Sequence, residues 1–464
     1  MSQPALTWLP AIGVAARRVS GRITPEPFAI AVALSVVVLI AGVMHLGGTG
    51  EAAARALTLW RGGVWSLLAF SMQASLMLVL GSALADAPVV RRGLVRLAGV
   101  ARGPRSLVGL TALVACTLGL VNWSFGLVCG ALFARTAGRT AAERGWSLHY
   151  PLLCAAGYTG MLVFHGGLSG TAPLKVTTMP DLIEVLGPAL AARVGPIPLT
   201  ASLFGGLNLC VTLGLWVITP LLFMGLTPRA GSDPAPQAAP ALAAPVPEDS
   251  SVAGDGRGWL DRLERARAVT WLLALPLAGA LVLLLRGAGL AAIDLNTINL
   301  GLWLLALVLH GRPDRFLRAC DAGVRACTGI VLLFPLYGGI MGVLGGSGLS
   351  QALSAQFAAA GAGVFTLVTF LSAGLLNLAI PSGGGQWAVQ GPVVMAAALA
   401  RDVPPAHAML AIAYGDQWTN MLQPFWAAPL LAITGVRARD IVGYCALALI
   451  VSGAWISACL LAFA

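Results

Sequence analysis

The stretch "NLAIPSGGGQWAVQGP", from Asn377 to Pro392, interrupts a long apolar segment of the chain. It follows "GVFTLVTFLSAGLL" and precedes "VVMAAALA", so its proline, serine, glycines and glutamines lie between two apolar arms. Inside hydrocarbon, non-helical backbone persists only where protein buries it or where it lines a water-filled cavity, because unsatisfied backbone groups are costly there. If the chain is embedded in a membrane, this stretch predicts a helix break beside a polar cavity.

Composition indicates that the chain is embedded in a membrane. Its 464 residues are 58% hydrophobic and only 10% charged, and the mean hydropathy is +0.85. These values are typical of a polytopic membrane protein rather than of a soluble domain. The net charge of +10 comes from basic residues at the ends of apolar segments, which argues for topology signals and against a nucleic-acid partner. The eight cysteines have no metal-ligand spacing and read as packing residues.

Apolar segments predict an all-α protein with about nine transmembrane helices, since a helix needs roughly 20 residues to cross a bilayer. The expected spans are residues 28–45, 64–84, 149–168, 199–225, 268–287, 297–311, 326–346, 407–432 and 439–463. No cleavage site convincingly follows the first apolar run, so we expect that run to remain as a span. We expect a multi-pass membrane protein, with the lipid bilayer as its surroundings and its N terminus in the cytoplasm.

Two further apolar regions, residues 107–136 and 363–400, are each broken in the middle. The interruptions are "NWSFG" (Asn122–Gly126) and "PSGGGQW" (Pro381–Trp387). The shorter arms do not reach the length of a span, which predicts re-entrant helical hairpins. Arginines flank the first region on both sides, so the positive-inside rule places both of its ends in the cytoplasm. The second hairpin is then expected to open to the opposite side.

The two halves of the chain share a pattern. Asn122 precedes Tyr158 much as Asn377 precedes Tyr414, and an Ala-Pro-Leu follows each tyrosine. This order predicts an inverted repeat of about four spans plus a hairpin, the architecture of secondary transporters. The expected parts are a cytoplasmic N-terminal segment (1–27), a first repeat (28–225), a cytoplasmic Pro/Ala-rich linker (226–267), a connecting span (268–296) and a second repeat (297–464).

The two hairpin tips and a polar insertion in the span 407–432 form the predicted binding site. Helix N termini with free N–H groups attract carboxylates, and hydroxyl and amide groups can complete their coordination. The candidate substrate ligands are Asn122, Ser124, Gly126, Ser382, Gly383, Gly384, Gly385, Gln386, Gln417 and Asn420. Candidate ligands for a coupling cation, Na⁺ or H⁺, are Asn122, Asn377, Ser382 and Asp416. No cofactor is expected beyond such an ion.

Each of these residues also has a structural interpretation. The glycines could serve close helix packing, and Asp416 could be a structural carboxylate held by neighbouring amides. His165, in the matching segment of the first half, fits a packing role as well as a titrating one. The sequence leaves these alternatives open.

Four segments resemble the bacterial short-chain fatty acid transporter family: "WSLLAFSMQASLMLVLG", "VNWSFGLVCGALFAR", "IPSGGGQWAVQGP" and "AIAYGDQWTNMLQPFWAAPLLAITG". The resemblance extends from about Trp8 to the C terminus and implies import of short monocarboxylates such as butyrate or acetoacetate. A more distant similarity to the ion-transporter superfamily with two opposed hairpins implies homodimers that move by an elevator-like shift. Those carriers have Ser-Asn-Thr at the tips, whereas this chain has Asn-Trp-Ser at 122–124 and Pro-Ser-Gly-Gly-Gly-Gln at 381–386.

These observations favour a symporter that works by cation- or proton-coupled alternating access. A passive channel or facilitator for small carboxylic acids is the first alternative, and a symporter for another small organic anion is the second. A membrane-embedded enzyme would need a nucleophile, a metal cluster or paired carboxylates, and the scattered histidines and single midspan aspartate supply none of these. The chain is therefore not expected to be an enzyme.

Overall fold

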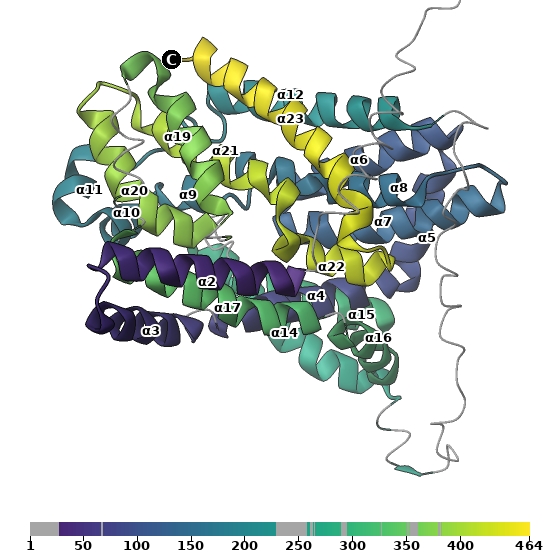
Figure 1. The fold of residues 1–464 in the computed structure, drawn as a ribbon. Helices are drawn as coiled ribbons and strands as arrows, with labels where there is room; N and C mark the ends of the chain where they lie inside the picture. The colour runs from purple at the N-terminus through teal and green to yellow at the C-terminus, as the bar shows by residue number, and fades with distance from the viewer. Residues whose placement is uncertain are drawn as a thin grey trace, which may run out of the picture.

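A computed structural model describes residues 27–65, 68–228, 258–259, 263, 265–288, 295–325, 327–349, 352, 361–378, 381 and 383–464. Secondary structure in these residues is helical, as Figure 1 shows. Almost all of the predicted N-terminal segment and most of the predicted linker lie outside the described residues. The division of the chain into two repeats and a connecting span stays a prediction.

The first half contains α2 (Pro27–His45), α3 (Gly50–Val64), α4 (Leu68–Asp86), α5 (Pro88–Gly99), α6 (Pro104–Val121), α7 (Trp123–Glu143), α8 (Tyr150–Tyr158), η1 (Thr159–Leu162), η2 (Phe164–Gly166), α9 (Thr171–Lys175), α10 (Met179–Leu186), α11 (Pro188–Val194) and α12 (Gly206–Leu226). The second contains α14 (Arg267–Ala288), α15 (Leu295–His310), α16 (Pro313–Arg325), α17 (Thr328–Gly346), α19 (Ala362–Asn377), α20 (Gly383–Leu399), α21 (Pro405–Thr419), η5 (Asn420–Leu422), α22 (Pro424–Thr434) and α23 (Ala438–Ala462).

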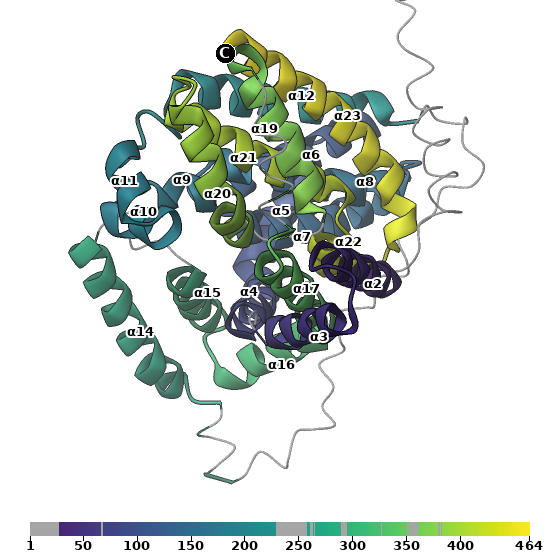
Figure 2. The same cartoon turned by 60° about the vertical axis from the view of Figure 1, so that its left-hand side comes forward.

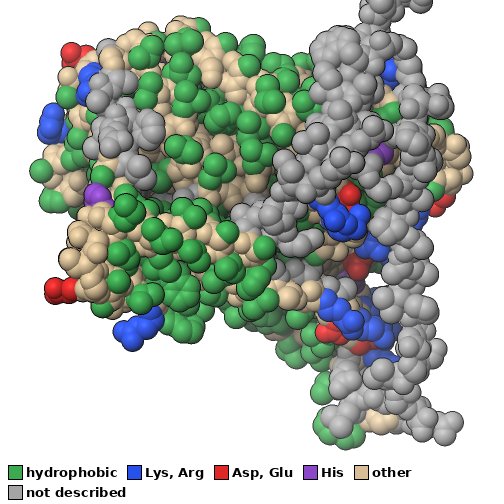
Figure 3. Space-filling model, in the orientation of Figure 1, with side chains coloured by type: hydrophobic (Ala, Val, Ile, Leu, Met, Phe, Trp, Pro, Cys, Tyr) green, Lys and Arg blue, Asp and Glu red, His purple; other side chains and the backbone are tan. Residues whose placement is uncertain are grey.

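Five segments of the described chain are long and apolar enough to cross a membrane. They are Pro104–Val121, Tyr150–Lys175, Gly206–Leu226, Arg267–Gly287 and Ala438–Ala462. In Figure 3 hydrophobic side chains cover most of the visible face between charged groups near its two ends. On α14, which Figure 2 shows at the periphery beside α15, Leu272 and Leu283 are more than two-thirds exposed. Apolar surface of this extent is typical of contact with lipid.

Both broken regions contain two helices that meet near the predicted interruption. α6 and α7 pack along each other and are joined at Asn122, whose backbone is extended (φ −158°). α19 ends at Asn377 and α20 begins at Gly383. α6 belongs to the segments long enough to cross a membrane, so the length of its arm does not support re-entry. The re-entrant path of both hairpins stays a prediction.

The expected spans 149–168 and 407–432 are not single helices, which corrects the sequence interpretation. The first runs from α8 through the 3₁₀ turns η1 and η2 to α9, with Gly167 and Gly170 in the break. The second runs from α21 through η5 to α22, which has proline at its N-terminal position. Proline cannot donate the hydrogen bond that would continue the helix, and glycine tolerates the irregular backbone.

Three helices with marked charge, α3, α5 and α16, were not predicted because their arginines make them too polar to resemble spans. α2 and α3 pack against α17, while α15 and α16 pack against α4. The order α2–α3–α4 therefore corresponds to α15–α16–α17, and each set packs against the last helix of the other. Such reciprocal packing agrees with a repeat; the inverted orientation remains a sequence prediction.

Candidate functional site

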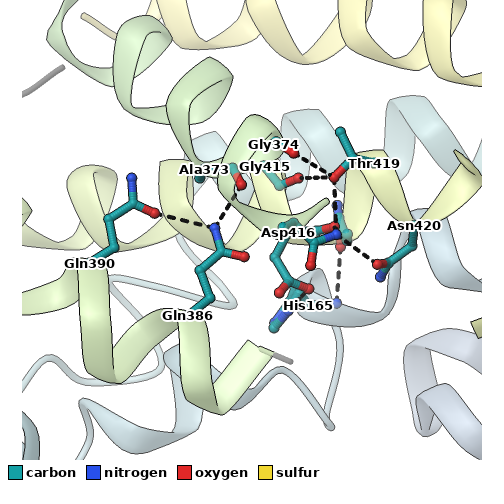
Figure 4. A network of polar contacts seen from close by, with 11 residues as sticks. His165, Ala373, Gly374, Gln386, Gln390, Gly415, Asp416, Thr419 and Asn420 are labelled. Carbon is teal, nitrogen blue, oxygen red and sulfur yellow. Dashed lines mark hydrogen bonds and ion pairs between the residues drawn. The ribbon is translucent and has the colours of Figure 1, made fainter. Parts of the chain in front are cut away.

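A buried acid–base pair joins the two broken helices. His165 of η2 and Asp416 of α21 lie with Nε2 and Oδ1 2.9 Å apart. The two residues are 0% and 2% exposed, respectively. Figure 4 shows the imidazole and carboxylate side by side, below the polar residues of α21. An ionisable pair so far from water is rare in a membrane protein and is expected to have a function.

The neighbouring backbone fixes this pair in place. The His165 backbone N–H, freed by the 3₁₀ geometry, donates to Gln417 Oε1 at 3.0 Å. The N terminus of α20 also lies close to the imidazole, because a Cβ atom at Gly383 would be 2.9 Å from His165 Cε1 and 3.0 Å from Nε2. Only glycine allows this approach without a shift of the ring. The predicted tip of the second hairpin thus meets the broken helix of the first half.

Asn377 ties the end of α19 to the break after α21. Its Nδ2 lies 2.8 Å from the Asp416 carbonyl oxygen, 3.0 Å from Thr419 Oγ1 and 2.9 Å from Asn420 Oδ1. Gln423 Nε2 donates to the Asn377 carbonyl oxygen at 2.6 Å. The backbone acceptors left by the end of one helix are therefore satisfied by side chains of the next.

Gln386 and Gln390 lie on one face of α20 and connect it to α19 (Figure 4). Gln386 Nε2 donates to the Ala373 carbonyl oxygen at 2.8 Å and to Gln390 Oε1 at 3.2 Å. Gln390 Nε2 donates to Ser372 Oγ at 3.0 Å. The amide of Gln386 is thereby oriented within a buried network rather than free to rotate.

Several polar atoms of this cluster are buried and have no hydrogen-bond partner. They are His165 Nδ1, Asn377 Oδ1, Gln386 Oε1, Asp416 Oδ2, Gln417 Nε2 and Asn420 Nδ2. Buried polar atoms in native proteins are almost always paired, so a group of unpaired ones points to a further partner. The set contains both donors and acceptors, which suits a small solute that carries both oxygen atoms and a proton. We refer to these six residues as the polar cluster.

The first hairpin tip is held by different contacts. Asn122 Oδ1 accepts from the Phe125 N–H at 3.1 Å, and the Gly126 N–H donates to the Asn122 carbonyl oxygen at 2.9 Å. The Trp123 N–H donates to Ser169 Oγ at 2.9 Å, and its ring lies 4.9 Å from the ring of Trp426. This tip therefore also touches both broken helices.

The predicted ligands divide into three groups. Asn377, Gln386, Asp416, Gln417 and Asn420 belong to the polar cluster, with Gly383, Gly384 and Gly385 in the adjoining first turn of α20. Asn122 and Gly126 make the local contacts of the first tip, where Gly126 packs on the backbone of Gly119. Ser382 and the side chain of Ser124 lie outside the described part of the structure. Substrate-binding roles for all of these residues stay predictions.

A supporting residue was missed by sequence reasoning. Asn208 of α12 accepts from Tyr414 Oη and Thr212 Oγ1, both at 3.0 Å. Its Nδ2 donates to the carbonyl oxygens of Gly166 at 3.0 Å and Leu203 at 2.7 Å. Asn208 thus contacts Gly166, which follows His165, and Tyr414, which lies two residues before Asp416. An asparagine in the middle of an apolar span was the available signal.

Of the four residues predicted to bind a coupling cation, Asp416 and Asn377 each have one buried oxygen without a hydrogen-bond partner, and Ser382 lies outside the described residues. Asp416 Oδ1 is engaged with His165, and Asn122 Oδ1 is engaged with the Phe125 N–H. Within the described residues no group of three or more His, Cys, Asp or Glu side chains could hold a metal ion. Sodium binding therefore stays a prediction of the sequence alone.

Comparison with known proteins identifies the family. The sequence profile of the "Short chain fatty acid transporter" family matches residues 9–463. The chain belongs to the short-chain fatty acid transporter family. An Escherichia coli K12 protein named "Putative short-chain fatty acid transporter" is 36% identical, over 94% of this chain and 96% of that protein. A Haemophilus influenzae protein of the same name is 34% identical, over 92% of this chain and 93% of that protein.

Two solved structures are also similar to the chain. Neisseria gonorrhoeae MtrF is 14% identical, with 96% of both chains covered and a TM-score of 0.45. The Alcanivorax borkumensis YdaH transporter is 15% identical, with 94% of this chain and 98% of that one covered and a TM-score of 0.44.

Membership of the short-chain fatty acid transporter family confirms the resemblance noted in the sequence. The chain is a transporter and not an enzyme, and it is an all-helical bacterial membrane protein.

Proposed function

We propose that this member of the short-chain fatty acid transporter family imports small monocarboxylates, such as butyrate or acetoacetate, across the inner membrane by cation- or proton-coupled alternating access. The observation that carries the proposal is the polar cluster, in which unpaired donors and acceptors lie buried between two broken helices. Broken helices that surround a polar site are the usual binding geometry of secondary transporters.

The chemistry of the polar cluster suits a single carboxylate. Gln417 Nε2 and Asn420 Nδ2 supply unpaired donors, and α20 directs its N terminus toward His165. A carboxylate is stabilised by such N–H groups and by the positive end of a helix dipole. His165 is the basic side chain among the described contacts of the cluster, so one negative charge is balanced more readily than two.

Burial of the cluster favours a carrier over a passive pore. His165, Asn377, Gln386, Gln417 and Asn420 are all 0% exposed. A carrier encloses its site between two alternating openings, whereas a pore needs a continuous wet path. A symporter for another small organic anion would use the same residues. It is distinguished from a short-chain fatty acid symporter by whether acetoacetate and butyrate are taken up in the assay below.

The test is uptake of labelled acetoacetate and butyrate into proteoliposomes, with proton and Na⁺ gradients imposed separately. We expect accumulation that follows one gradient and exceeds uptake by protein-free vesicles, which measure passage of the undissociated acid through lipid. Equilibration without accumulation under either gradient would support the passive pore. Uptake equal to that of protein-free vesicles would contradict transport of these acids.

Asp416→Asn should abolish accumulation while the protein still inserts and folds, because the amide keeps the shape of the carboxylate but cannot carry a positive ion or proton. The matched control is Asp402→Asn, at an exposed position with φ 54°, a conformation that asparagine tolerates well. Accumulation by Asp416→Asn equal to that of the control would remove Asp416 from the coupling mechanism.

A further inference from the structure

We propose that His165 and Asp416 form a carboxylate exchange pair: the substrate carboxylate replaces Asp416 at the imidazole while Asp416 accepts one proton. The inference rests on the proposed function and deepens it, because it assigns the coupling ion as H⁺ and makes His165 the group that binds the substrate carboxylate.

The contacts of the pair supply the polar partners that this exchange needs. Asp416 Oδ1 lies 2.9 Å from His165 Nε2 and contacts it, while Oδ2 of the same carboxylate and Nδ1 of the same ring are buried and unpaired. The first turn of α20 lies against the ring at Gly383. Because the ring and Gly383 are too close for an acid to lie between them, the substrate carboxylate takes the place of Asp416 Oδ1 at Nε2, with the N terminus of α20 beside it. The N terminus of α20 and the buried His165 imidazole thus lie next to each other at Gly383.

The exchange keeps the buried charge balanced in both states. In the proposed exchange without substrate, the positive charge of the His165 imidazolium and the negative charge of the Asp416 carboxylate sum to zero. With substrate, the imidazolium pairs with the substrate carboxylate, and Asp416 is neutral because it has accepted a proton on Oδ2. An uncompensated charge in a low-dielectric interior is costly. A site with no net charge can therefore move between the two sides of the membrane more readily than a site with one net charge. One proton enters with each acid and leaves with it: the O–H bond on Asp416 Oδ2 forms on binding and breaks on release, and no other covalent bond changes.

Other ionisable groups on the described elements around the pair have separate surroundings. They are Arg105 and Cys116 on α6, Lys175 on α9, Cys210 on α12, His407 and Tyr414 on α21, and Arg439, Asp440, Tyr444, Cys445 and Cys459 on α23. Cys116 contacts Thr159, Lys175 pairs with Asp181, and Tyr414 donates to Asn208. α19 and α20 carry no ionisable side chain in their described ranges. Asp416 is thus the acid that contacts His165.

A proton suits the pair better than a metal cation does. Nε2 of His165 faces Asp416 Oδ1, so a cation on that oxygen would meet the positive edge of the imidazole at short range. A proton on Oδ2 converts an acceptor-only carboxylate into a hydrogen-bond donor, and the polar cluster holds unpaired oxygens that can accept from such a donor.

The test is isothermal titration of the purified full-length protein with acetoacetate in detergent without Na⁺, in two buffers that differ in ionisation enthalpy. The difference in heat between the buffers reports protons taken up on binding. At about pH 5, below the ordinary histidine pKa so that the imidazolium stays charged without Asp416, we expect about one proton per acid in the wild type and about none in Asp416→Asn, whose side chain mimics the protonated carboxyl. His165→Gln should weaken binding at least about tenfold, through loss of a charged partner for the carboxylate.

His407→Gln is the control for the histidine, because His407 lies on α21 beside Phe463, away from the cluster. Binding without proton uptake, proton uptake that persists in Asp416→Asn, or binding that requires Na⁺ would overturn the exchange pair and leave the proposed function standing. If the wild type binds neither acetoacetate nor butyrate, either without Na⁺ or after Na⁺ is added, the proposed function itself fails. Should His165→Gln not fold, the proton count of Asp416→Asn still decides.

Discussion

The His165 imidazole and the first glycine of α20 are too close for any side chain to fit between them. A Cβ atom at position 383 would lie 2.9 Å from Cε1 of the ring, and the ring itself is held by Asp416. The ring cannot move without giving up the Asp416 contact, and α20 cannot move without disturbing the Gln386 network. Position 383 therefore couples the hairpin tip to the acid–base pair.

Gly383→Ala should accordingly weaken binding of acetoacetate by about tenfold or more, because the methyl group displaces the imidazole or the helix N terminus. Calorimetric titration measures the change. Gly363→Ala is the control, since a Cβ atom there meets nothing within 4 Å and alanine favours the helix. Equal affinities of the two variants would show that the close approach of α20 to His165 is not needed for binding.

Sequence reasoning found the residues of the polar cluster only in part. Asn377, Gln386, Asp416, Gln417 and Asn420 were visible because polar side chains are rare in apolar spans. His165 was left undecided because a lone histidine has no partner in its own segment, and its partner Asp416 lies 251 positions away. Asn122 was visible for the same reason as Asn377; its Oδ1 accepts from the Phe125 N–H, and its binding role stays a prediction. Which polar residues meet is a tertiary property that spacing does not encode.

At the scale of helices, hydropathy located the segments but not their continuity. The predicted span 268–287 corresponds to α14 and 439–463 to α23, with ends displaced by a residue or so. The spans 149–168 and 407–432 were expected to be continuous because a few helix-breaking residues change the mean hydropathy of a long segment very little. The amphipathic helices α3 and α16 were missed because they pack against protein on one side, and their charged faces lower the hydropathy.

The contact between α3 and α17 depends on glycine. A Cβ atom at Gly342 would lie 2.5 Å from the Leu59 carbonyl oxygen and 2.8 Å from Gly63 Cα. Gly342→Val should separate the helices and destabilise the protein by about 1–3 kcal/mol, the usual cost of overpacking. A lower unfolding temperature in detergent measures the effect.

Gly62→Ala provides the comparison on the same helix but away from the interface, because position 62 has no neighbour within 4 Å. An unchanged unfolding temperature for Gly342→Val would mean that α3 does not pack on α17 as the structure describes.

At the scale of the whole molecule, the two halves repeat an order of helices and place their breaks against each other. The tip after α19 contacts His165 of the first half, and the tip after α6 contacts Trp426 of the second. A site built from both halves changes when one half moves relative to the other, which is the requirement for alternating access. Homodimer formation and an elevator-like shift follow from the distant resemblance alone and stay predictions.

The central claim, that a short monocarboxylate binds inside an alternating-access carrier, is tested most directly by counterflow. Proteoliposomes are loaded with unlabelled acetoacetate and diluted into a trace of the labelled acid, and the label inside is followed with time. The account predicts a transient accumulation of label above equilibrium, absent from protein-free vesicles, because carrier sites return occupied by outgoing acid. A steady approach to equilibrium with no overshoot would contradict the carrier and favour a passive pore.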